Sequence, residues 1–398
     1  GPAGWELPRL ARQLGADQVF CARRWEPAAL RQDGVVAEAL AAAGVGLTVV
    51  EGGLLNAPDR VRKTGGGPYQ VFTPYWRTAA PAIVPGPALP VPPLRGLRRW
   101  PATLDLRELR LLPRPDWAGG LRAVWQPGEA GAHRALAAFV AGGLAQYEAG
   151  RDLLAEEGIS RLSPHLHFGE LSPAQVWRAV DGLPGSPAYQ RQLGWREFGY
   201  QLLCHFPHTP DQPLRPEYGA FPWGDEPEHL RAWQQGRTGY PLVDAGMRQL
   251  WQTGWMHNRA RMVTASFLVK HLLIRWQEGA RWFWDTLVDA NLANNTLGWQ
   301  WAAGCGADAA PYFRIFNPAR QGERFDPQGR YVRRWVPELE GLPDAWVHRP
   351  SAAPAAVLAG AGVVLGRSYP FPLVDHAMAR GRALAALAEM KQRFRAGC

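Results

Sequence analysis

The chain has 398 residues, and 44 Lys and Arg residues against 35 Asp and Glu residues give it a formal net charge of +9. Hydrophobic residues make up 46% of it, which excludes intrinsic disorder, and the length predicts two domains or three. No apolar run approaches the roughly 20 residues that span a bilayer. The four cysteines form no C-x-x-C pair, which argues against a disulfide scaffold, a zinc module or an iron–sulfur cluster and fits a reducing cytoplasm.

Two features of the composition need an explanation. There are 19 tryptophans, more than core packing requires, and lysine is so rare that arginine carries nearly all of the positive charge. A basic balance indicates a polyanionic partner such as nucleic acid. A GC-rich genome, which enriches Arg, Ala, Pro and Gly together, explains the arginine excess equally well, so charge alone does not decide between the two.

Residues 1–85 are predicted to form a small α/β domain. Two apolar runs of strand length, 18–22 (QVFCA) and 46–50 (GLTVV), flank a helical pattern over 27–43. Residues 69–73 (YQVFT) are predicted to form a weaker third strand. Three strands make a thin sheet, whose edge needs a neighbour or a cover.

Residues 86–120 are too rich in proline for regular structure and are predicted to be a linker, whereas residues 121–398 are predicted to be helical. Ser172-Pro173 is typical of a helix start, with a serine cap followed by proline at the first helical position, and Ser163-Pro164 repeats the signal. Two further helices are predicted, at 256–276 and 377–394.

Three segments carry polar residues in patterns typical of ligand sites. Residues 147–163 (YEAGRDLLAEEGISRLS) lead into a Ser-Pro helix start that suits a phosphate, although most such starts bind nothing. One face of the helix predicted at 256–276 either presents Asn258, Arg261 and Met262 to a ligand or is an ordinary solvated face. Residues 289–318 place amides beside tryptophans, and a heteroaromatic ring would give those amides partners. That segment contains Asp289, Asn291, Asn294, Asn295, Trp299 and Trp301.

Long motifs between about residues 69 and 387 resemble the photolyase/cryptochrome family. They are SRLSPHLHFGELSP, WREF, GYPLVDAGMRQL, TGWMHNRARM and LGWQWAAGCGADAAPYFRIFNP. Within the family the chain resembles the class I cyclobutane pyrimidine dimer photolyases. The resemblance implies a mainly α protein, in which a small, shortened N-terminal α/β domain of Rossmann-like type (1–85) precedes the linker and an all-helical, FAD-binding C-terminal domain (121–398).

The resemblance also implies roles for residues around FAD. The diphosphate and ribityl chain would contact Tyr147, Ser160, Arg161, Leu162 and Ser163. An ion pair between Arg261 and Asp289 would lie beside the flavin ring, with Asn291 close by and Asn295 facing flavin N5. Electrons would reach the photoexcited flavin from the surface through Trp223, Trp276 and Trp299.

The implied reaction is light-driven repair of UV-induced cyclobutane pyrimidine dimers, in which excited, fully reduced FAD donates an electron to a flipped-out dimer. Trp195 and Trp301 would sandwich the dimer, in a pocket that Gln192, Asn258 and Met262 line. Arg151, Arg259 and Arg314 would contact DNA phosphates. The expected partner is UV-damaged DNA, with no membrane, and the expected enzyme is a cytoplasmic bacterial monomer, associated with the nucleoid through DNA.

Several positions depart from the family pattern. Gln192 stands where dimer photolyases usually carry Glu and resembles the (6-4) photolyases, but Asn258 and Met262 replace the paired histidines of a (6-4) enzyme. Asn291 replaces the second Asp of a D-x-D pair, and Ile159 replaces a hydroxyl residue of the phosphate segment. Four alternatives therefore stay open: (6-4) repair, dual-specificity repair, a cryptochrome-like blue-light sensor, and a nucleic-acid-binding flavoprotein without activity.

Two further observations bear on these alternatives. Plant-type sensors usually carry Asp where this chain has Asn295, which favours repair. The strand and Arg/Asp-rich segment with which the family usually opens have no counterpart here, and Ala28 and Ala29 stand where folate-binding members carry Asn and Glu. We therefore expect a shortened N-terminal domain and no stable antenna chromophore.

Overall fold

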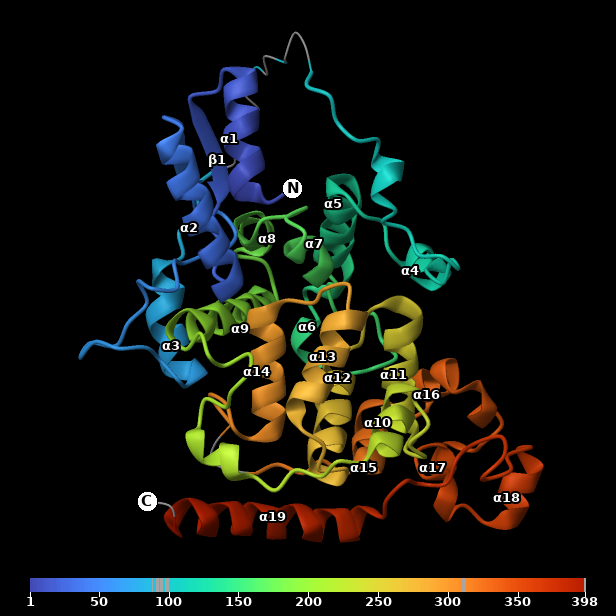
Figure 1. The fold of residues 1–398 in the computed structure, drawn as a ribbon. Helices are drawn as coiled ribbons and strands as arrows, with labels where there is room; N and C mark the ends of the chain where they lie inside the picture. The colour runs from blue at the N-terminus through green and yellow to red at the C-terminus, as the bar shows by residue number, and fades with distance from the viewer. Residues whose placement is uncertain (88, 91–92, 94–95, 97–99, 310–312, 397–398) are drawn as a thin grey trace.

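A computed structural model describes residues 1–398 apart from 88, 91–92, 94–95, 97–99, 310–312 and 397–398. The N-terminal unit consists of α1 (Ala3–Leu14), β1 (Gln18–Ala22), α2 (Pro27–Ala42) and β2 (Gly46–Val50). Its strands pair in parallel, with Gln18 opposite Gly46 and Ala22 opposite Val50. The predicted α/β unit is therefore confirmed, as helices beside a two-stranded sheet (Figure 1).

The third strand predicted at 69–73 is wrong, because a helix, α3 (Phe72–Ala79), begins inside that segment. The buried residues Phe72, Tyr75 and Ala79 follow helical spacing rather than the alternation of a strand. Phe72 packs face to face on the indole of Trp195, with ring centroids 3.8 Å apart. The aromatic run that suggested a strand is the face by which a helix packs on the helical body.

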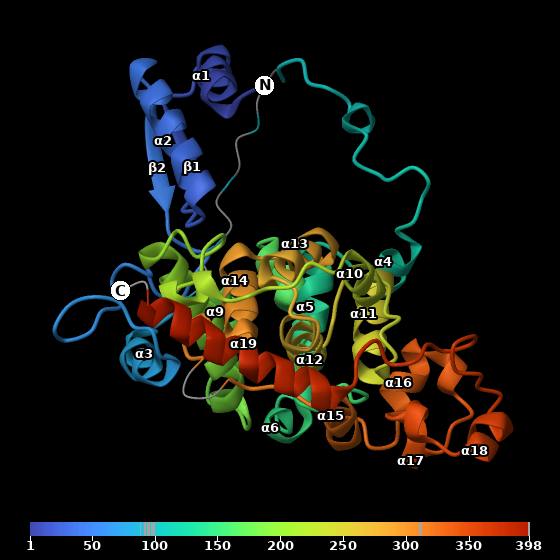
Figure 2. The ribbon, with the colours of Figure 1, turned by 60° about the horizontal axis from the view of Figure 1, so that its bottom comes forward.

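The described residues between α3 and α4 (Gly119–Val124) have little regular structure. They contain short 3₁₀ turns, η1 (Ala80–Ala82) and η2 (Leu106–Leu109). Residues 100–118 run outside the helical body in both views (Figure 1, Figure 2). The domain boundaries at 85 and 120 stay predictions.

The rest of the chain forms a helical body around a large apolar core, so the predicted mainly α fold is confirmed. Trp233, Leu250, Val263 and Leu268 lie in this core with no exposed surface. The helices are α5 (Glu129–Ala138), α6 (Tyr147–Gly150), α7 (Ser163–His167), α8 (Pro173–Val180), α9 (Ser186–His205), α10 (Pro227–Gln234), α11 (Pro241–Thr253), α12 (Asn258–Ser266), α13 (Trp276–Thr286), α14 (Leu292–Ala303), α15 (Pro318–Phe325), α16 (Arg330–Trp335), α17 (Asp344–Val347), α18 (Ala355–Gly360) and α19 (His376–Ala396).

The two Ser-Pro helix starts differ in their caps. Ser172 caps α8 as predicted: its hydroxyl accepts from the backbone N–H of Gln175 at 3.1 Å, and the Gln175 side chain accepts from the backbone N–H of Ser172 at 2.7 Å. Ser163 is instead the first residue of α7, and Leu162 occupies the cap position without a side-chain hydrogen bond. The serine cap predicted at Ser163 is therefore wrong by one position.

The long helix predicted at 256–276 is wrong as a single element. Its first part, α12, begins at Asn258 because Nδ1 of His257 accepts from the backbone N–H of Arg259 at 3.1 Å. A π turn, η5 (Phe267–His271), follows, and Leu273 has a positive φ of 54°. The helix is therefore interrupted after Ser266, and Trp276 starts a new helix, α13.

The C-terminal helix predicted at 377–394 is confirmed as α19, which lies along the outside of the helical body (Figure 2). It packs against η5 and against η4 (Pro216–Ala220), and Ala379, Ala383 and Met390 are buried. Among the described residues, no helix is both long and apolar enough to cross a membrane.

Candidate functional site

Two neighbouring cavities lie in the helical body. The tryptophan cavity, of about 350 Å³, is lined by Trp195, Trp299 and Trp301, and the serine cavity, of about 310 Å³, is lined by Ser160 and Ser163. Side chains from α9, α12, α14 and the segment before α14 line both cavities, so segments far apart in the sequence meet here. The shared residues are Gln192, Trp195, Asn258, Arg261, Asp289, Asn291 and Asn294.

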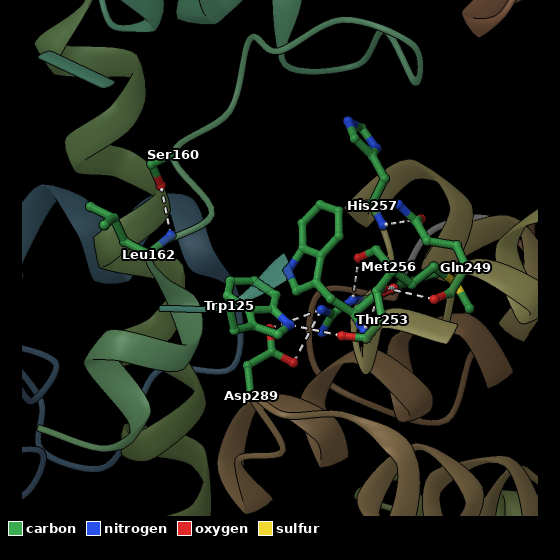
Figure 3. Close-up of polar contacts among 10 residues, drawn as sticks. Trp125, Ser160, Leu162, Gln249, Thr253, Met256, His257 and Asp289 are labelled. Atoms are coloured by element: carbon green, nitrogen blue, oxygen red, sulfur yellow. Dashed lines mark hydrogen bonds and ion pairs between the residues drawn. The ribbon is translucent and has the colours of Figure 1, made fainter. Parts of the chain in front are cut away.

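The serine cavity collects four of the five residues predicted to contact the FAD diphosphate: Tyr147, Ser160, Leu162 and Ser163. The hydroxyl of Tyr189 donates to Oγ of Ser160 at 3.0 Å, and the backbone N–H of Leu162 donates to the same atom at 3.4 Å (Figure 3). The fifth residue, Arg161, has a φ of 50° and directs its guanidinium over the ring of Trp255, 5.4 Å from the centroid.

The expected ion pair between Arg261 and Asp289 is present where the two cavities meet. Nη2 of Arg261 lies 2.8 Å from Oδ2 of Asp289, and its Nε donates to the carbonyl of Met256 at 2.8 Å (Figure 3). Asp289 is only 8% exposed, and a carboxylate so deeply buried requires a charged partner. The pair therefore holds one fixed cation and one fixed anion at the cavity wall.

The amides at the start of α14 are ordered by the helix cap. Oδ1 of Asn291 accepts from the backbone N–H of Asn294 at 3.0 Å, and Nδ2 of Asn291 donates to the hydroxyl of Tyr200 at 2.6 Å. Nδ2 of Asn295 donates to the carbonyl of Ala280 at 2.9 Å, which directs its Oδ1 away from that carbonyl. Asn295 lines the tryptophan cavity, so the site offers both amide donors and amide acceptors.

The three tryptophans predicted to carry electrons differ in position. Trp299 lines the tryptophan cavity, is 2% exposed and packs edge to face on Phe283 at 5.0 Å. Its buried Nε1 has no hydrogen-bond partner among the described residues. Trp276 is equally buried at the start of α13, and Trp223 is half-buried beside Phe221 at 4.3 Å. Neither of these two lines a cavity described above.

The residues predicted to hold the damaged bases all line the tryptophan cavity. Trp195 and Trp301 supply half-buried aromatic walls, and the stack on Phe72 fixes the plane of the Trp195 ring. On α12, Nδ2 of Asn258 lies 3.8 Å from Sδ of Met262. Gln192, one turn before Trp195 on α9, lines both cavities.

The three arginines predicted to contact phosphate are in different surroundings. Arg151 lines the tryptophan cavity, and Arg314 lines a smaller third cavity beside Trp301. Arg259 lines none of the three, because its guanidinium forms an ion pair with Asp152 at 2.7 Å and lies 4.2 Å from the centroid of Phe325. The role of Arg259 as a phosphate contact stays a prediction, and its charge is already paired with Asp152.

Several lining residues had no role predicted from the sequence: His167, Asn294, Tyr189, Trp255 and Phe283. Asn294 had a usable signal, because it stands three residues after Asn291, the spacing of a cap and its partner. His167 lies four residues after Ser163, on one helical face. Burial lowers the pKa of His167, and the carboxylate of Asp289 opposes that shift. Tyr189 and Trp255 carried no local signal.

Comparisons with known proteins agree with this site. The FAD binding domain of DNA photolyase matches residues 189–389, and the family described as DNA photolyase matches residues 1–93. A deoxyribodipyrimidine photo-lyase from Agrobacterium fabrum is 48% identical over 400 residues, which are 98% of this chain and 84% of that protein. Cryptochrome-1 of Arabidopsis thaliana is 36% identical over 96% of this chain and 58% of its own length. The chain belongs to the DNA photolyase/cryptochrome family.

The class within the family differs from the expectation. A crystal structure of a bacterial class III photolyase from Agrobacterium tumefaciens superimposes with a TM-score of 0.93 at 47% identity, covering 98% of this chain and 83% of that one. The resemblance to class I enzymes is therefore corrected to a class III-like one.

The residues of the two cavities fit a flavin dinucleotide, the cofactor that the family implies. The serine cavity offers hydroxyl groups at the start of a helix, and the tryptophan cavity offers amides, a cation and an unpaired indole N–H. A phosphate suits the former and a heteroaromatic ring with several polar edges suits the latter. Because the cavities share seven lining residues, the diphosphate and the flavin ring of one dinucleotide could occupy them together.

Proposed function

We propose that this protein is a deoxyribodipyrimidine photo-lyase that repairs cyclobutane pyrimidine dimers in UV-damaged DNA with light. The observation that carries the proposal is the tryptophan cavity, whose aromatic walls adjoin a buried Arg261–Asp289 ion pair. The 48% identity to a named deoxyribodipyrimidine photo-lyase over nearly the whole chain supports the same conclusion.

FAD is the proposed cofactor, with its fully reduced form active. Light-excited reduced flavin supplies the electron that splits the dimer, which is chemistry that belongs to the cofactor. The protein would bind and orient the cofactor: Ser160 and Ser163 would hold the diphosphate, and Arg261 and Asp289 would hold the ring. Trp299, with Trp276 and Trp223 behind it, is the proposed route by which electrons re-reduce the flavin.

The dimer is proposed to turn out of the duplex and to enter the tryptophan cavity. Photolyases are among the enzymes that turn a base out of the stack, at a cost of a few kcal/mol. Stacking on an aromatic side chain returns about 1–3 kcal/mol per base, and Trp195 and Trp301 provide two such surfaces. Arg151 and Arg314 supply sequence-independent attraction to phosphate.

A (6-4) or dual-specificity repair activity is the second candidate. The observation that favours it is Gln192, which lines both cavities where dimer photolyases usually have Glu. Against it, Asn258 and Met262 occupy the part of the cavity where a (6-4) enzyme would carry histidines. A blue-light sensor without repair activity is a weaker alternative, because Asn295 rather than Asp lines the cavity.

The test uses FAD-loaded, chemically reduced protein and oligonucleotides that carry one defined lesion. We expect blue light to convert the cyclobutane dimer to two pyrimidines, measured by chromatography, with no conversion in the dark. The variant Trp195→Ala should keep its flavin absorbance and lose most of the conversion. An intact dimer after illumination of the reduced protein would overturn the proposal, and conversion of the (6-4) lesion alone would favour the second candidate.

We further propose that the protein carries no stable antenna chromophore, because Ala28 and Ala29 offer no polar side chain for folate. Pigment released by denaturation should contain FAD alone, and folate or a deazaflavin in equal amount would overturn this.

We also propose a monomer of the bacterial cytoplasm that associates with the nucleoid through DNA. Light scattering on a sizing column should give a mass near 44.0 kDa.

A further inference from the structure

A third cavity shares the Trp301 wall of the tryptophan cavity. This lysine cavity has a volume of about 180 Å³, and the residues that give it its character are Ser266, Lys270, Gly304, Asp308 and Arg314. The first two come from the end of α12 and from η5, and the other three from the segment after α14. Its lining is mostly polar, although most of the surrounding core is apolar.

Lys270 is the unusual residue of this cavity. It is 1% exposed, and its Nζ donates to the carbonyl of Ala303 at 2.8 Å and lies 3.0 Å from the centroid of the Phe313 ring. Among the described residues no carboxylate forms an ion pair with it. A carbonyl and an aromatic face stabilise a cation only in part, so a buried ammonium here has no full counter-charge. Burial lowers its pKa well below the usual value.

The other charged groups of the lysine cavity leave it positive. Arg314 is a second cation, whose guanidinium lies 5.9 Å from the centroid of Trp301. The carboxylate that lines the cavity, Asp308, accepts from the backbone N–H of Phe72 at 3.2 Å, and burial raises its pKa. Two cations against one carboxylate, together with the hydroxyl of Ser266, favour an anion with several acceptor oxygens, such as a phosphate group.

We propose that the lysine cavity is an anion site for a backbone phosphate of the DNA strand whose flipped dimer stacks on Trp301, with Lys270 as its buried cation. The inference rests on the proposed function, because Trp301 is the wall that the dimer and its phosphate would share. A phosphate bound there gives Lys270 the counter-charge that the free protein lacks. Asp308, the carboxylate on the described wall of the cavity, accepts from the backbone N–H of Phe72 and forms no ion pair with Lys270.

This arrangement couples DNA binding to proton uptake. Lys270 is easier to deprotonate in the free protein than beside a phosphate, so binding takes up a proton wherever the pH lies between the two pKa values. In that range the affinity for DNA falls as the pH rises. The slope cannot exceed about a factor of ten per pH unit, the limit for one linked proton.

No titratable neighbour of Lys270 among the described residues changes its protonation state in the pH range in which DNA affinity would be measured. Burial raises the pKa of Cys305 and of Tyr218 to about 12 and lowers that of His271, the next residue along η5, to about 3. On α19, burial lowers the pKa of His376. These groups therefore keep one protonation state between pH 7.5 and 9. The other charged groups close by are Asp308, Arg314, Arg215 and Glu217, and Arg382 of α19, which donates to the carbonyl of His271.

The experiment measures the affinity of the FAD-loaded protein for a dimer-containing oligonucleotide in the dark, between pH 7.5 and 9 and at several salt concentrations. We expect the wild-type affinity to fall as pH rises. Lys270→Met should bind more weakly, with a flat pH profile and a salt slope smaller by about 1. Lys270→Arg should keep the salt slope but also have a flat pH profile, because arginine does not lose its proton in this range.

Lys63→Met is the matched control, since it removes the charge of an exposed lysine of the N-terminal unit and should behave like the wild type. A Lys270→Met protein that keeps its flavin spectrum, the wild-type pH profile and the wild-type salt slope would overturn the inference. If Lys270→Met does not fold, a Lys270→Arg protein that keeps the pH profile would overturn it instead. Equal affinity for damaged and undamaged oligonucleotides would count against the proposed function, and the pH profile would still report on Lys270.

Discussion

At the scale of single residues, the amide of Asn291 shows how a helix cap can set the chemistry of a cavity wall. Its oxygen is committed to the backbone N–H of Asn294, so its nitrogen must face the other way, toward Tyr200. The carboxylate that usually stands at this family position could only accept hydrogen bonds and would carry a negative charge. The proposed flavin site of this chain would therefore have a neutral amide where the family pattern usually has an anion.

The first prediction follows from that difference. Asn291→Asp should lower the reduction potential of bound FAD by some tens of millivolts, because a new negative charge opposes the anionic reduced ring; about 59 mV corresponds to a factor of ten for one electron. A spectroelectrochemical titration measures the potential. Tyr200→Phe removes the hydrogen-bond partner without adding charge and should shift the potential much less. An unchanged potential in Asn291→Asp would contradict the argument.

The sequence indicated which residues belong to the candidate site, but not which partner each side chain faces. Arg259 and Arg261 stand two residues apart in one motif, and both were predicted to serve the site. Arg261 pairs with Asp289 at the cavity wall, whereas Arg259 pairs with Asp152 away from it. Two residues on a helix differ by more than half a turn, so their roles depend on which carboxylate the fold places opposite each.

At the scale of elements, local signals predicted helix starts better than helix ends. The Ser172 cap and the C-terminal helix could be predicted from residues close to them in the sequence. The break after α12 did not, because residues 263–274 are buried on all sides and therefore show no periodicity that could mark a turn. The π turn and the positive φ of Leu273 depend on packing against other helices, which the sequence of this segment does not encode locally.

The contact between α13 and α14 gives a prediction at this scale. A Cβ at Gly279 would lie 2.0 Å from Cη2 of Trp299, so the two helices approach closely only because this residue is glycine. Gly279→Ala should lower the free energy of unfolding by about 1–3 kcal/mol through overpacking, and it should weaken flavin retention. Gly381→Ala on α19 meets no atom within 4 Å and should instead stabilise by up to about 1 kcal/mol. Urea unfolding distinguishes them, and a stabilising Gly279→Ala would refute the close contact.

The cap of α8 gives a second prediction for an element. Ser172→Ala removes the acceptor of the Gln175 backbone N–H and should cost about 1 kcal/mol of stability. Ser172→Asp should keep most of the wild-type stability, because its carboxylate can accept the same bond and favours a helix N-terminus. Thermal unfolding at constant flavin loading is the measurement. Equal destabilisation by both substitutions would show that the hydroxyl has another role.

At the scale of the whole molecule, one buried carboxyl group joins the segment that follows β2 to the helical body. Glu197 on α9 is 2% exposed, and its Oε2 accepts from the backbone N–H groups of Leu55 at 2.7 Å and Asn56 at 3.2 Å. Arg196 lies 3.0 Å from Oε1. The sequence predicted both parts of the molecule, but this junction joins residues more than 140 positions apart, and no local pattern indicates it.

This junction makes the stability of the molecule depend on pH. Burial raises the pKa of Glu197 from 4.5 to about 7, against the opposing effect of Arg196. A carboxyl whose pKa is raised in the folded protein favours folding fully below pH 4.5, and that contribution is lost as the pH rises through 7, up to about 3 kcal/mol. Urea unfolding at pH 5 and pH 8 should therefore show a smaller difference for Glu197→Gln, which cannot ionise, than for the wild type. Glu38→Gln, at an exposed position on α2, is the control and should match the wild type. An identical pH dependence in all three proteins would mean that Glu197 stays ionised when buried.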